Sequence, residues 1–383
     1  MTRPARAFID LAALRHNFQQ VRERAAGCRV LAVVKADAYG HGAGAVATAL
    51  EDADGFAVAR VQEGRELRAL GIDRPVVLLS GVSSGQELAD AASLRLDLVV
   101  HHDSQTAALE RAALRDPVGV WIKVDTGMHR LGLAPERIPD TWRRLETCPS
   151  VAAPLRLMTH LARADERGDP STADQITRFM SLEQAAGAET SLANSAGILA
   201  WPAAHGHWVR PGIMLYGISP FVGGRGEADG LRPVMTFESR LIAVNRLSKG
   251  DAIGYGGTWT CPEDMPVGVV AVGYGDGYPR HAPAGTPVLV NGTRVALIGR
   301  VSMDLVTVDL RPQPAAAPGD PVVLWGRGLP AEEIAEHVGS IGYELVTRVA
   351  PRVARVARVA RVTREIGETG DAQSRSASAG ESR

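Results

Sequence analysis

The feature that most constrains the fold is an alternation, over the first 215 residues, of short apolar runs with segments of helical periodicity. The runs are rich in β-branched residues, and the seventh is the least distinct; they occupy residues 31–34, 55–59, 76–79, 96–100, 118–124, 155–159, 190–193 and 209–215. Apolar residues recur at helical spacing between most of them, as in residues 61–70, 86–94, 106–114 and 173–186. Continuous apolar strands separated by helices are typical of a parallel sheet covered by helices. Eight such units in about 200 residues favour a closed (β/α)₈ TIM barrel over an open doubly wound sheet.

A change of composition after residue 216 indicates a second domain. Residues 221–229 are rich in glycine and charge, as a linker would be. Short β-rich runs follow at residues 240–245, 267–272, 287–290, 294–298 and 305–309, and Asn291-Gly292 is a strong hairpin signal. We therefore expect a barrel over residues 8–225 and a mostly β domain over residues 232–362, with room in the latter for the first few N-terminal residues.

The C-terminal segment differs from the rest of the chain. Residues 352–362 repeat arginine, valine and alanine with a period of three, and residues 363–383 are small and polar. Such a tail cannot bury enough apolar surface to fold, so we expect residues 363–383 to be disordered. The arginine repeat could form an anion or nucleic-acid patch, but a low-complexity extension is the simpler interpretation.

Composition excludes several classes of protein. The 383 residues carry 42 basic and 43 acidic side chains, so no bulk charge favours a nucleic acid or an anionic membrane as partner. No run reaches the roughly 18 apolar residues of a membrane helix, and charges interrupt every apolar stretch of the N-terminus, so we expect no secretory signal. Three widely spaced cysteines indicate neither a disulfide framework nor a thiolate metal site. A cytoplasmic protein without a metal is expected.

Lysine is scarce, so each lysine needs an explanation. Only Lys35, Lys123 and Lys249 occur among the 42 basic residues. Lys35 follows the first apolar run, and the chemistry of barrels resides in the loops at the C-terminal ends of their strands. Poor solvation there lowers the pKa of a lysine and makes its amine nucleophilic toward an aldehyde, with which it can form an imine. The alternatives are a lysine that reaches solvent from the rim or pairs with Asp37. Lys249 is expected in a solvated turn.

A second cluster follows the fifth run and contains Lys123, Asp125 and Arg130. A guanidinium group can grip a carboxylate through two parallel hydrogen bonds, which suits an amino-acid substrate. The alternative is a structural ion pair among the three side chains.

Polar residues also follow the last three runs. His160 ends the sixth, where a lone histidine is most often structural. Residues 194–197 and 210–217 follow the seventh and cover the eighth, where barrels commonly bind a phosphate through backbone amides and a hydroxyl. An imine-forming lysine, a phosphate site and a carboxylate-binding arginine together describe an enzyme that uses pyridoxal 5′-phosphate on an amino acid.

Five motifs, in order along residues 8–353, resemble the alanine racemase family. They are the segments 32–42, 123–132, 210–217, 254–256 and 299–304. Several long motifs at consistent positions are far more specific than one short pattern. The resemblance implies an isomerase that uses pyridoxal 5′-phosphate to interconvert L-alanine and D-alanine and supplies D-alanine for peptidoglycan. One departure is Leu161, where the family usually has phenylalanine.

The resemblance also assigns roles to single residues. Lys35 would hold the cofactor covalently and act as one base, and Tyr255 of the partner subunit would be the second base on the opposite face of the substrate Cα. Arg210 would bind the pyridine nitrogen, and His160 would link Arg210 to that tyrosine. The residues that would bind the phosphate are Tyr39, Ser195, Gly212, Ile213 and Tyr343.

Substrate binding and assembly follow from the same resemblance. Arg130 and the backbone of Met303 of the partner subunit would hold the substrate carboxylate, and Lys123 matches a lysine that some members carbamylate to orient this arginine. Shared residues imply a head-to-tail homodimer without a competent monomer. A racemase of wider substrate range is the main alternative. A barrel-type amino-acid decarboxylase is disfavoured, because those enzymes generally present an acid, where this chain has Arg210, to the pyridine nitrogen.

Overall fold

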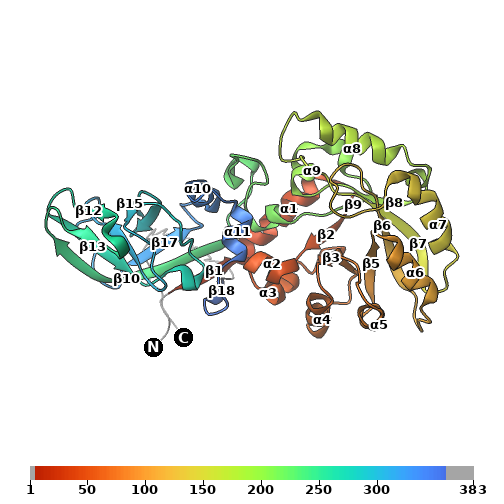
Figure 1. Ribbon diagram of the computed structural model, residues 1–383, viewed down its shortest axis with the longest axis horizontal. Coiled ribbons are helices and arrows are strands. Elements are labelled where there is room, and N and C mark those ends of the chain that lie inside the picture. The colour runs from red at the N-terminus through yellow and green to blue at the C-terminus, as the bar shows by residue number, and fades with distance from the viewer. Residues whose placement is uncertain (1–4, 359–383) are drawn as a thin grey trace, which may run out of the picture.

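The computed structural model describes residues 5–358, and one lobe of it is a barrel of parallel strands wrapped by helices (Figure 1). The barrel strands are β2 (Arg29–Val33), β3 (Gly55–Val58), β4 (Val76–Leu78), β5 (Leu96–Val100), β6 (Val118–Lys123), β7 (Val151–Met158), β8 (Glu189–Ser191) and β9 (Trp208–Val209). They pair in the order β8-β7-β6-β5-β4-β3-β2-β9. Backbone hydrogen bonds from His207 to Thr190 and from Arg210 to Ala193 join β9 back to β8. The predicted (β/α)₈ barrel is confirmed.

Helices cover the outside of this barrel (Figure 1). They are α1 (Leu11–Arg24), α3 (Ala43–Ala49), α4 (Val61–Ala69), α5 (Gly85–Ser93), α6 (Asp103–Arg111), α7 (Ile138–Glu146), α8 (Pro170–Met180) and α9 (Ser195–Ala200), with the short 3₁₀ helices η1 (Pro135–Arg137), η2 (Glu183–Ala186) and η3 (Pro202–Ala204). Side-chain caps fix several of their starts: Asp10 accepts from the first turn of α1, and Asp169 does so for α8. Within residues 5–358, no helix combines the length and the apolarity needed to cross a bilayer.

The eighth strand is much shorter than the sequence predicted. β9 ends at Val209, and η4 (Ile213–Tyr216) is a 3₁₀ helix where a strand was expected to continue to residue 215. Pro211 interrupts the strand because it has no N–H to donate to a neighbour. The backbone N–H groups of Gly212 and Met214 turn instead toward the Ser195 hydroxyl, at 2.9 and 3.3 Å. This correction matters for function, because it brings backbone donors to the mouth of the barrel.

The second lobe is mostly antiparallel sheet, as predicted. Its main strands are β1 (Arg6–Asp10), β10 (Met235–Leu247), β13 (Met265–Val270), β14 (Pro287–Val290), β15 (Thr293–Ile298), β16 (Val306–Asp309), β17 (Pro321–Trp325) and β18 (Ala354–Arg358), in the order β13-β16-β15-β14-β17-β10-β1-β18. The predicted turn at Asn291-Gly292 joins β14 to β15, with positive φ at both residues. β1 precedes the barrel in sequence, yet it pairs with β10 and β18 in this sheet.

Smaller elements complete the second lobe. They are η5 (Gly226–Asp229), the two-stranded β11 (Ala252–Ile253) and β12 (Trp259–Thr260), η6 (Tyr255–Gly257), η7 (Tyr274–Asp276), α10 (Ala331–His337) and α11 (Gly342–Thr347). α11 lies beside α2 (Lys35–Gly40) of the barrel (Figure 1). Gly40 allows this approach, because its φ is +79° and a Cβ there would lie 2.2 Å from the Val346 carbonyl oxygen. The contact brings Tyr343 of α11 to within 6.2 Å of the Tyr39 ring, measured between centroids.

The first part of the arginine repeat is structural, which corrects the expectation of a low-complexity extension. Residues 354–358 form β18, and Arg355 donates to the carbonyls of Gly40 and Val349 at 3.1 and 2.8 Å. Buried carbonyl groups at the junction of the lobes thus obtain donors from a segment whose composition is typical of disorder. The rest of the repeat and the tail predicted to be disordered lie outside the described residues.

Candidate active site

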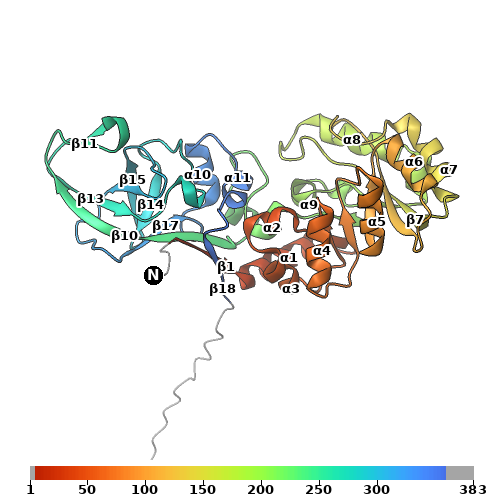
Figure 2. The same cartoon turned by 60° about the horizontal axis from the view of Figure 1, so that its bottom comes forward.

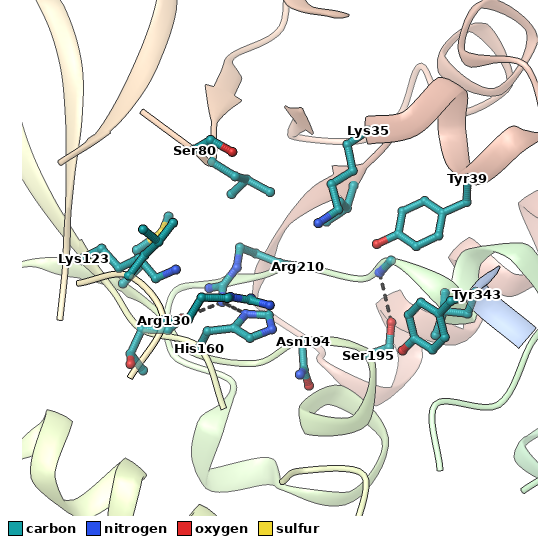
Figure 3. Close-up of a pocket in the computed structure, with 17 residues that line it drawn as sticks. Lys35, Tyr39, Ser80, Lys123, Arg130, His160, Asn194, Ser195, Arg210 and Tyr343 are labelled. Carbon is teal, nitrogen blue, oxygen red and sulfur yellow. Dashed lines mark hydrogen bonds between the residues drawn. The ribbon is translucent and has the colours of Figure 1, made fainter. Parts of the chain in front are cut away.

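The C-terminal ends of the barrel strands open onto a cavity of about 510 Å³. This volume falls within the roughly 300–1,000 Å³ of typical small-molecule sites. Most of the predicted site residues line this cavity; they are Lys35, Tyr39, Lys123, Arg130, His160, Ser195, Arg210, Gly212, Ile213 and Tyr343. The side chains of Lys35 and Tyr39 point into it (Figure 3). The structure therefore brings together predicted residues from five separate strand ends, those of β2, β6, β7, β8 and β9, and from the second lobe.

Lys35 begins a backbone turn of unusual hand. Residues 36–39 of α2 have φ between 52° and 54°, so this short element is a left-handed helical turn. Each non-glycine residue in that conformation costs about 1–2 kcal/mol, and such strain is concentrated at functional sites. Hydrogen bonds support the turn: Ala36 N donates to Glu63 at 2.7 Å, and Ala43 N donates to Asp37 at 2.7 Å. The Asp37 carboxylate thus stabilises the backbone after this turn.

Four cationic side chains face this cavity: Lys35, Lys123, Arg130 and Arg210. Burial, together with Arg130, lowers the pKa of Lys35, and Glu63 only partly opposes this. Burial and the charges of Arg210 and Arg130 lower the pKa of Lys123 to about 8. None of the 17 described lining residues is acidic. The cavity is therefore suited to a ligand with more than one negative charge.

Arg210 lies under the centre of the cavity and is almost fully buried. Its guanidinium donates to the Ser191 hydroxyl and to the Thr159 carbonyl, both at 2.6 Å. Burial lowers its pKa to about 10, so it stays charged at neutral pH. His160 Nδ1 is 3.4 Å from this guanidinium (Figure 3). Burial and the neighbouring cations hold the pKa of His160 well below its usual value, so the ring is neutral.

This contact selects the tautomer of His160. A guanidinium can only donate, so Nδ1 must accept and the proton of the neutral ring resides on Nε2. His160 therefore offers one N–H donor on the side away from Arg210.

The loop that carries Arg130 folds back onto its own strand. Asp125 N donates to the Leu133 carbonyl and Leu133 N donates to the Lys123 carbonyl, both at 2.8 Å. The Asp125 carboxylate accepts from the Gly127 and His129 backbone N–H groups and lies 3.0 Å from His129 Nδ1. Asp125 thus pairs with His129, in place of the alternative ion pair with Lys123 and Arg130.

One end of the cavity collects hydroxyl groups. Ser195 accepts from Gly212 N, which orients its own hydroxyl hydrogen away from that loop. Burial raises the pKa of Tyr39 to about 12 and also raises the pKa of Tyr343, so both phenols are neutral donors at pH 7. A Cβ at residue 212 would lie 2.7 Å from the Tyr39 hydroxyl oxygen, so a larger residue here would displace that hydroxyl. Three neutral hydroxyl donors beside the Gly212–Ile213 backbone fit a phosphate.

Two predicted site residues lie outside this cavity. Tyr255, in η6, is 69% exposed, and Met303 is 54% exposed. Strands β11 and β12, which flank Tyr255, lie at the end of the second lobe that is remote from the barrel (Figures 1 and 2). The Tyr255 of one chain therefore does not reach its own Lys35.

Comparison with known proteins identifies the family of this chain. The family model for the alanine racemase N-terminal domain matches residues 9–220, and the one for the alanine racemase C-terminal domain matches residues 234–357. The chain belongs to the alanine racemase family. A protein named alanine racemase from Nitrosococcus oceani is 55% identical over 347 residues, which cover 91% of this chain and 97% of that protein. One from Halorhodospira halophila is 52% identical over 354 residues, covering 92% and 97%.

Solved structures give the same result. The biosynthetic alanine racemase from Pseudomonas aeruginosa superposes with a TM-score of 0.89 at 46% identity, covering 93% of this chain and 100% of that one. The alanine racemase from Acinetobacter baumannii gives a TM-score of 0.86 at 37% identity, covering 93% and 100%.

The sequence of this alanine racemase family member did not reveal every residue that lines the cavity. Leu79 and Ser80 follow β4, and Met158 ends β7. Their position at the C-terminal end of a barrel strand was the available signal. None of these three residues belongs to a motif that carried a chemical argument, so the position alone did not mark them.

Proposed function

We propose that this chain is an alanine racemase, an isomerase that interconverts L-alanine and D-alanine with pyridoxal 5′-phosphate. The observation that carries the proposal is the cavity with four cationic side chains and no acidic lining residue among those described. The phosphate of the cofactor and the carboxylate of an amino acid supply the negative charges that such a cavity requires. We place the reaction in the cytoplasm, where D-alanine would serve peptidoglycan synthesis.

The residues present fit this cofactor. The phosphate would be held by the hydroxyls of Tyr39, Ser195 and Tyr343 and by the backbone of Gly212 and Ile213. Lys35, whose lowered pKa favours the nucleophilic amine, would hold the cofactor covalently. When bound, the cofactor supplies an electron sink that acidifies the Cα hydrogen of the amino acid. Arg210 would donate to the pyridine nitrogen and, because it is a cationic donor, keep that nitrogen unprotonated.

Two bases on opposite faces of the substrate would accomplish the inversion. The neutral amine of Lys35 takes the Cα proton on one face, and the phenol of Tyr255 of the partner subunit delivers a proton on the other. In the opposite direction the phenolate accepts the proton and the Lys35 ammonium returns one. His160 would donate its Nε2–H to the phenolate oxygen, which stabilises the charged form of that tyrosine. The proposed enzyme is thus a homodimer with shared sites.

Arg130 and the backbone of Met303 of the partner subunit would hold the substrate carboxylate. We infer that Lys123 is carbamylated: its neutral amine adds to carbon dioxide, forms an N–C bond and releases one proton. With a pKa of about 8, the amine is increasingly neutral as the pH rises through 8, so carbamylation should increase over the same range. The product is an anion beside Arg130, where the unmodified side chain would be a competing cation, and Lys35, Arg130 and Arg210 remain as the cationic lining residues.

We expect ¹³C-bicarbonate to give a carbamate NMR signal in the wild type at pH 8.5, weaker at pH 6.5 and absent in Lys123→Gln. The same variant should show a KM for alanine raised by roughly 10- to 150-fold, since a charged hydrogen bond contributes roughly 1.5–3 kcal/mol. Lys249→Gln is the control. A signal that persists in Lys123→Gln would contradict the assignment.

The proposed function is tested by incubating the purified protein and pyridoxal 5′-phosphate with L-alanine and separating the enantiomers by chiral chromatography. We expect D-alanine to accumulate to equal amounts of both forms. Parallel incubations with L-serine and larger L-amino acids measure substrate range. Absence of D-alanine from protein that has bound the cofactor would overturn the proposal, and release of an amine and carbon dioxide would indicate a decarboxylase.

A further inference from the structure

We propose that Gln175, on α8 outside the cavity, is a positioning residue. By joining the loops that carry Arg130 and His160, it fixes the position of these two side chains relative to each other. The inference deepens the proposed function and rests on it, since Arg130 would hold the substrate carboxylate and His160 would contact the second base. Gln175 is only 3% exposed, on a helix whose other polar residues mostly face solvent.

The amide of Gln175 bonds to both loops. Its Oε1 accepts from Ala162 N at 2.8 Å, and its Nε2 donates to the His160 carbonyl at 3.1 Å, both in the loop after β7. The second hydrogen of Nε2 is donated to Thr126 Oγ1, also at 3.1 Å, in the loop after β6. Both hydrogens and the carbonyl oxygen of the amide are therefore used. Only a side chain with two donors and an acceptor can make this set of bonds.

A chain of hydroxyl groups extends the connection. Thr159 Oγ1 donates its hydrogen to the Val124 carbonyl at 2.9 Å, and it lies 2.8 Å from Thr126 Oγ1. Thr126 must therefore donate to Thr159, and it can accept the hydrogen of Gln175. All members are buried, so removing one donor leaves its partner unpaired, which is more costly than losing an exposed hydrogen bond.

Arg178 adds a second contact from the same helix. One turn after Gln175, its Nη1 donates to the Thr126 carbonyl at 2.6 Å. A Cβ on Gly127 would lie 3.4 Å from Gln175 Cγ, so the loop is packed directly against α8. Arg130 follows Gly127 by three residues. The Thr159 carbonyl also accepts from Arg210 at 2.6 Å, so the connected loops share a contact with the centre of the cavity.

The chain contains a matched counterpart elsewhere in the barrel. Gln105, on α6, is 7% exposed; its Oε1 accepts from His101 N at 2.8 Å and its Nε2 donates to the Val82 carbonyl at 3.1 Å. It joins the loops after β4 and β5, which carry neither Arg130 nor His160. Substitution there should disturb the barrel to a similar extent without moving those two side chains.

The experiment compares Gln175→Glu with Gln105→Glu in the cofactor-loaded dimer. Glutamate has nearly the same shape, but its carboxylate cannot donate and would face the His160 carbonyl. Hydrogen exchange is measured for residues 125–133 and 159–164, and kcat and KM are measured for alanine. Calorimetry gives the affinity for propionate, which has the carboxylate of alanine without its amine. For Gln175→Glu we expect faster exchange in both segments, propionate binding weaker by about tenfold and a KM that rises more than kcat falls.

The control variant separates positioning from general stability. Gln105→Glu should exchange faster only near residues 80–83 and 101–104, with propionate affinity within about twofold of the wild type. Unchanged exchange in both loops of Gln175→Glu, or an equal loss of affinity in both variants, would overturn the inference. Should Gln175→Glu fail to fold, Thr126→Val and Thr126→Ser provide the same comparison, because only serine keeps the hydroxyl. A wild type that does not racemise alanine would contradict the proposed function, and the exchange data would still decide the role of Gln175.

Discussion

Replacing Lys35 by alanine is expected to lower kcat/KM for alanine by more than about 10⁴-fold and to abolish covalent retention of the cofactor. A positioned base contributes 10²–10⁴-fold by itself, and this lysine would also bind the cofactor. The physical basis is its place at the end of β2, where burial and two guanidinium groups lower its pKa. Enantiomer ratios measure the first effect. Borohydride reduction followed by peptide mass spectrometry measures the second.

The scarcity of lysine makes this experiment unusually selective. With three lysines in 383 residues, a reduced cofactor can be attached at few positions, and we expect it on Lys35 alone. Lys249→Ala, in an exposed turn, is the matched control and should behave as the wild type. Attachment to Lys123 instead, or retention of the label in Lys35→Ala, would contradict the assignment.

Mixing inactive Lys35→Ala subunits with inactive Tyr255→Ala subunits is expected to restore about a quarter of wild-type activity. In a symmetric dimer that exchanges freely, half of the molecules are mixed, and one of the two sites in each mixed dimer receives both bases. We expect this recovery because Tyr255 does not line the cavity of its own chain and its side chain is exposed. The two variants are mixed at low concentration so that their subunits exchange, and the mixture is then concentrated. Racemase activity is measured throughout.

The control for this experiment is a subunit that carries both substitutions. Mixed with Lys35→Ala, the double variant cannot form a complete site, so no activity should appear. No recovery in the first mixture, despite proven exchange of subunits, would contradict shared sites and require a second base from the same chain.

The sequence predicted most of the barrel and of its cavity, because both follow from local patterns. The apolar runs identified β2 to β8 within a few residues, and side chains at their C-terminal ends meet in any closed parallel barrel. Lys35 and Arg130 were thus found from position and chemistry, whereas position alone indicated a structural histidine at 160 and placed Arg210 only within a phosphate-binding segment. The resemblance to the alanine racemase family then added roles that no periodicity could provide.

Features that depend on distant contacts were missed. β18 lies in a repeat that is typical of disorder, and it forms because β1, nearly 350 residues earlier, offers a free edge. The left-handed turn at residues 36–39 has no signal in residues such as Ala36 and Ala38, which normally avoid positive φ. Gln175 was not recognised because its partners come from two other loops.

The sequence by itself determined the order of strands and helices and the residues that face the barrel mouth. These depend on hydrophobic periodicity and on chain connectivity, which are properties of neighbouring residues. Only the tertiary structure decided how the electrostatics of the site are set. Burial and four convergent cations shift the pKa values of Lys35, Lys123 and His160, and Gln175 joins the loops around them, because these effects require groups that are remote in sequence to lie within a few ångströms of each other.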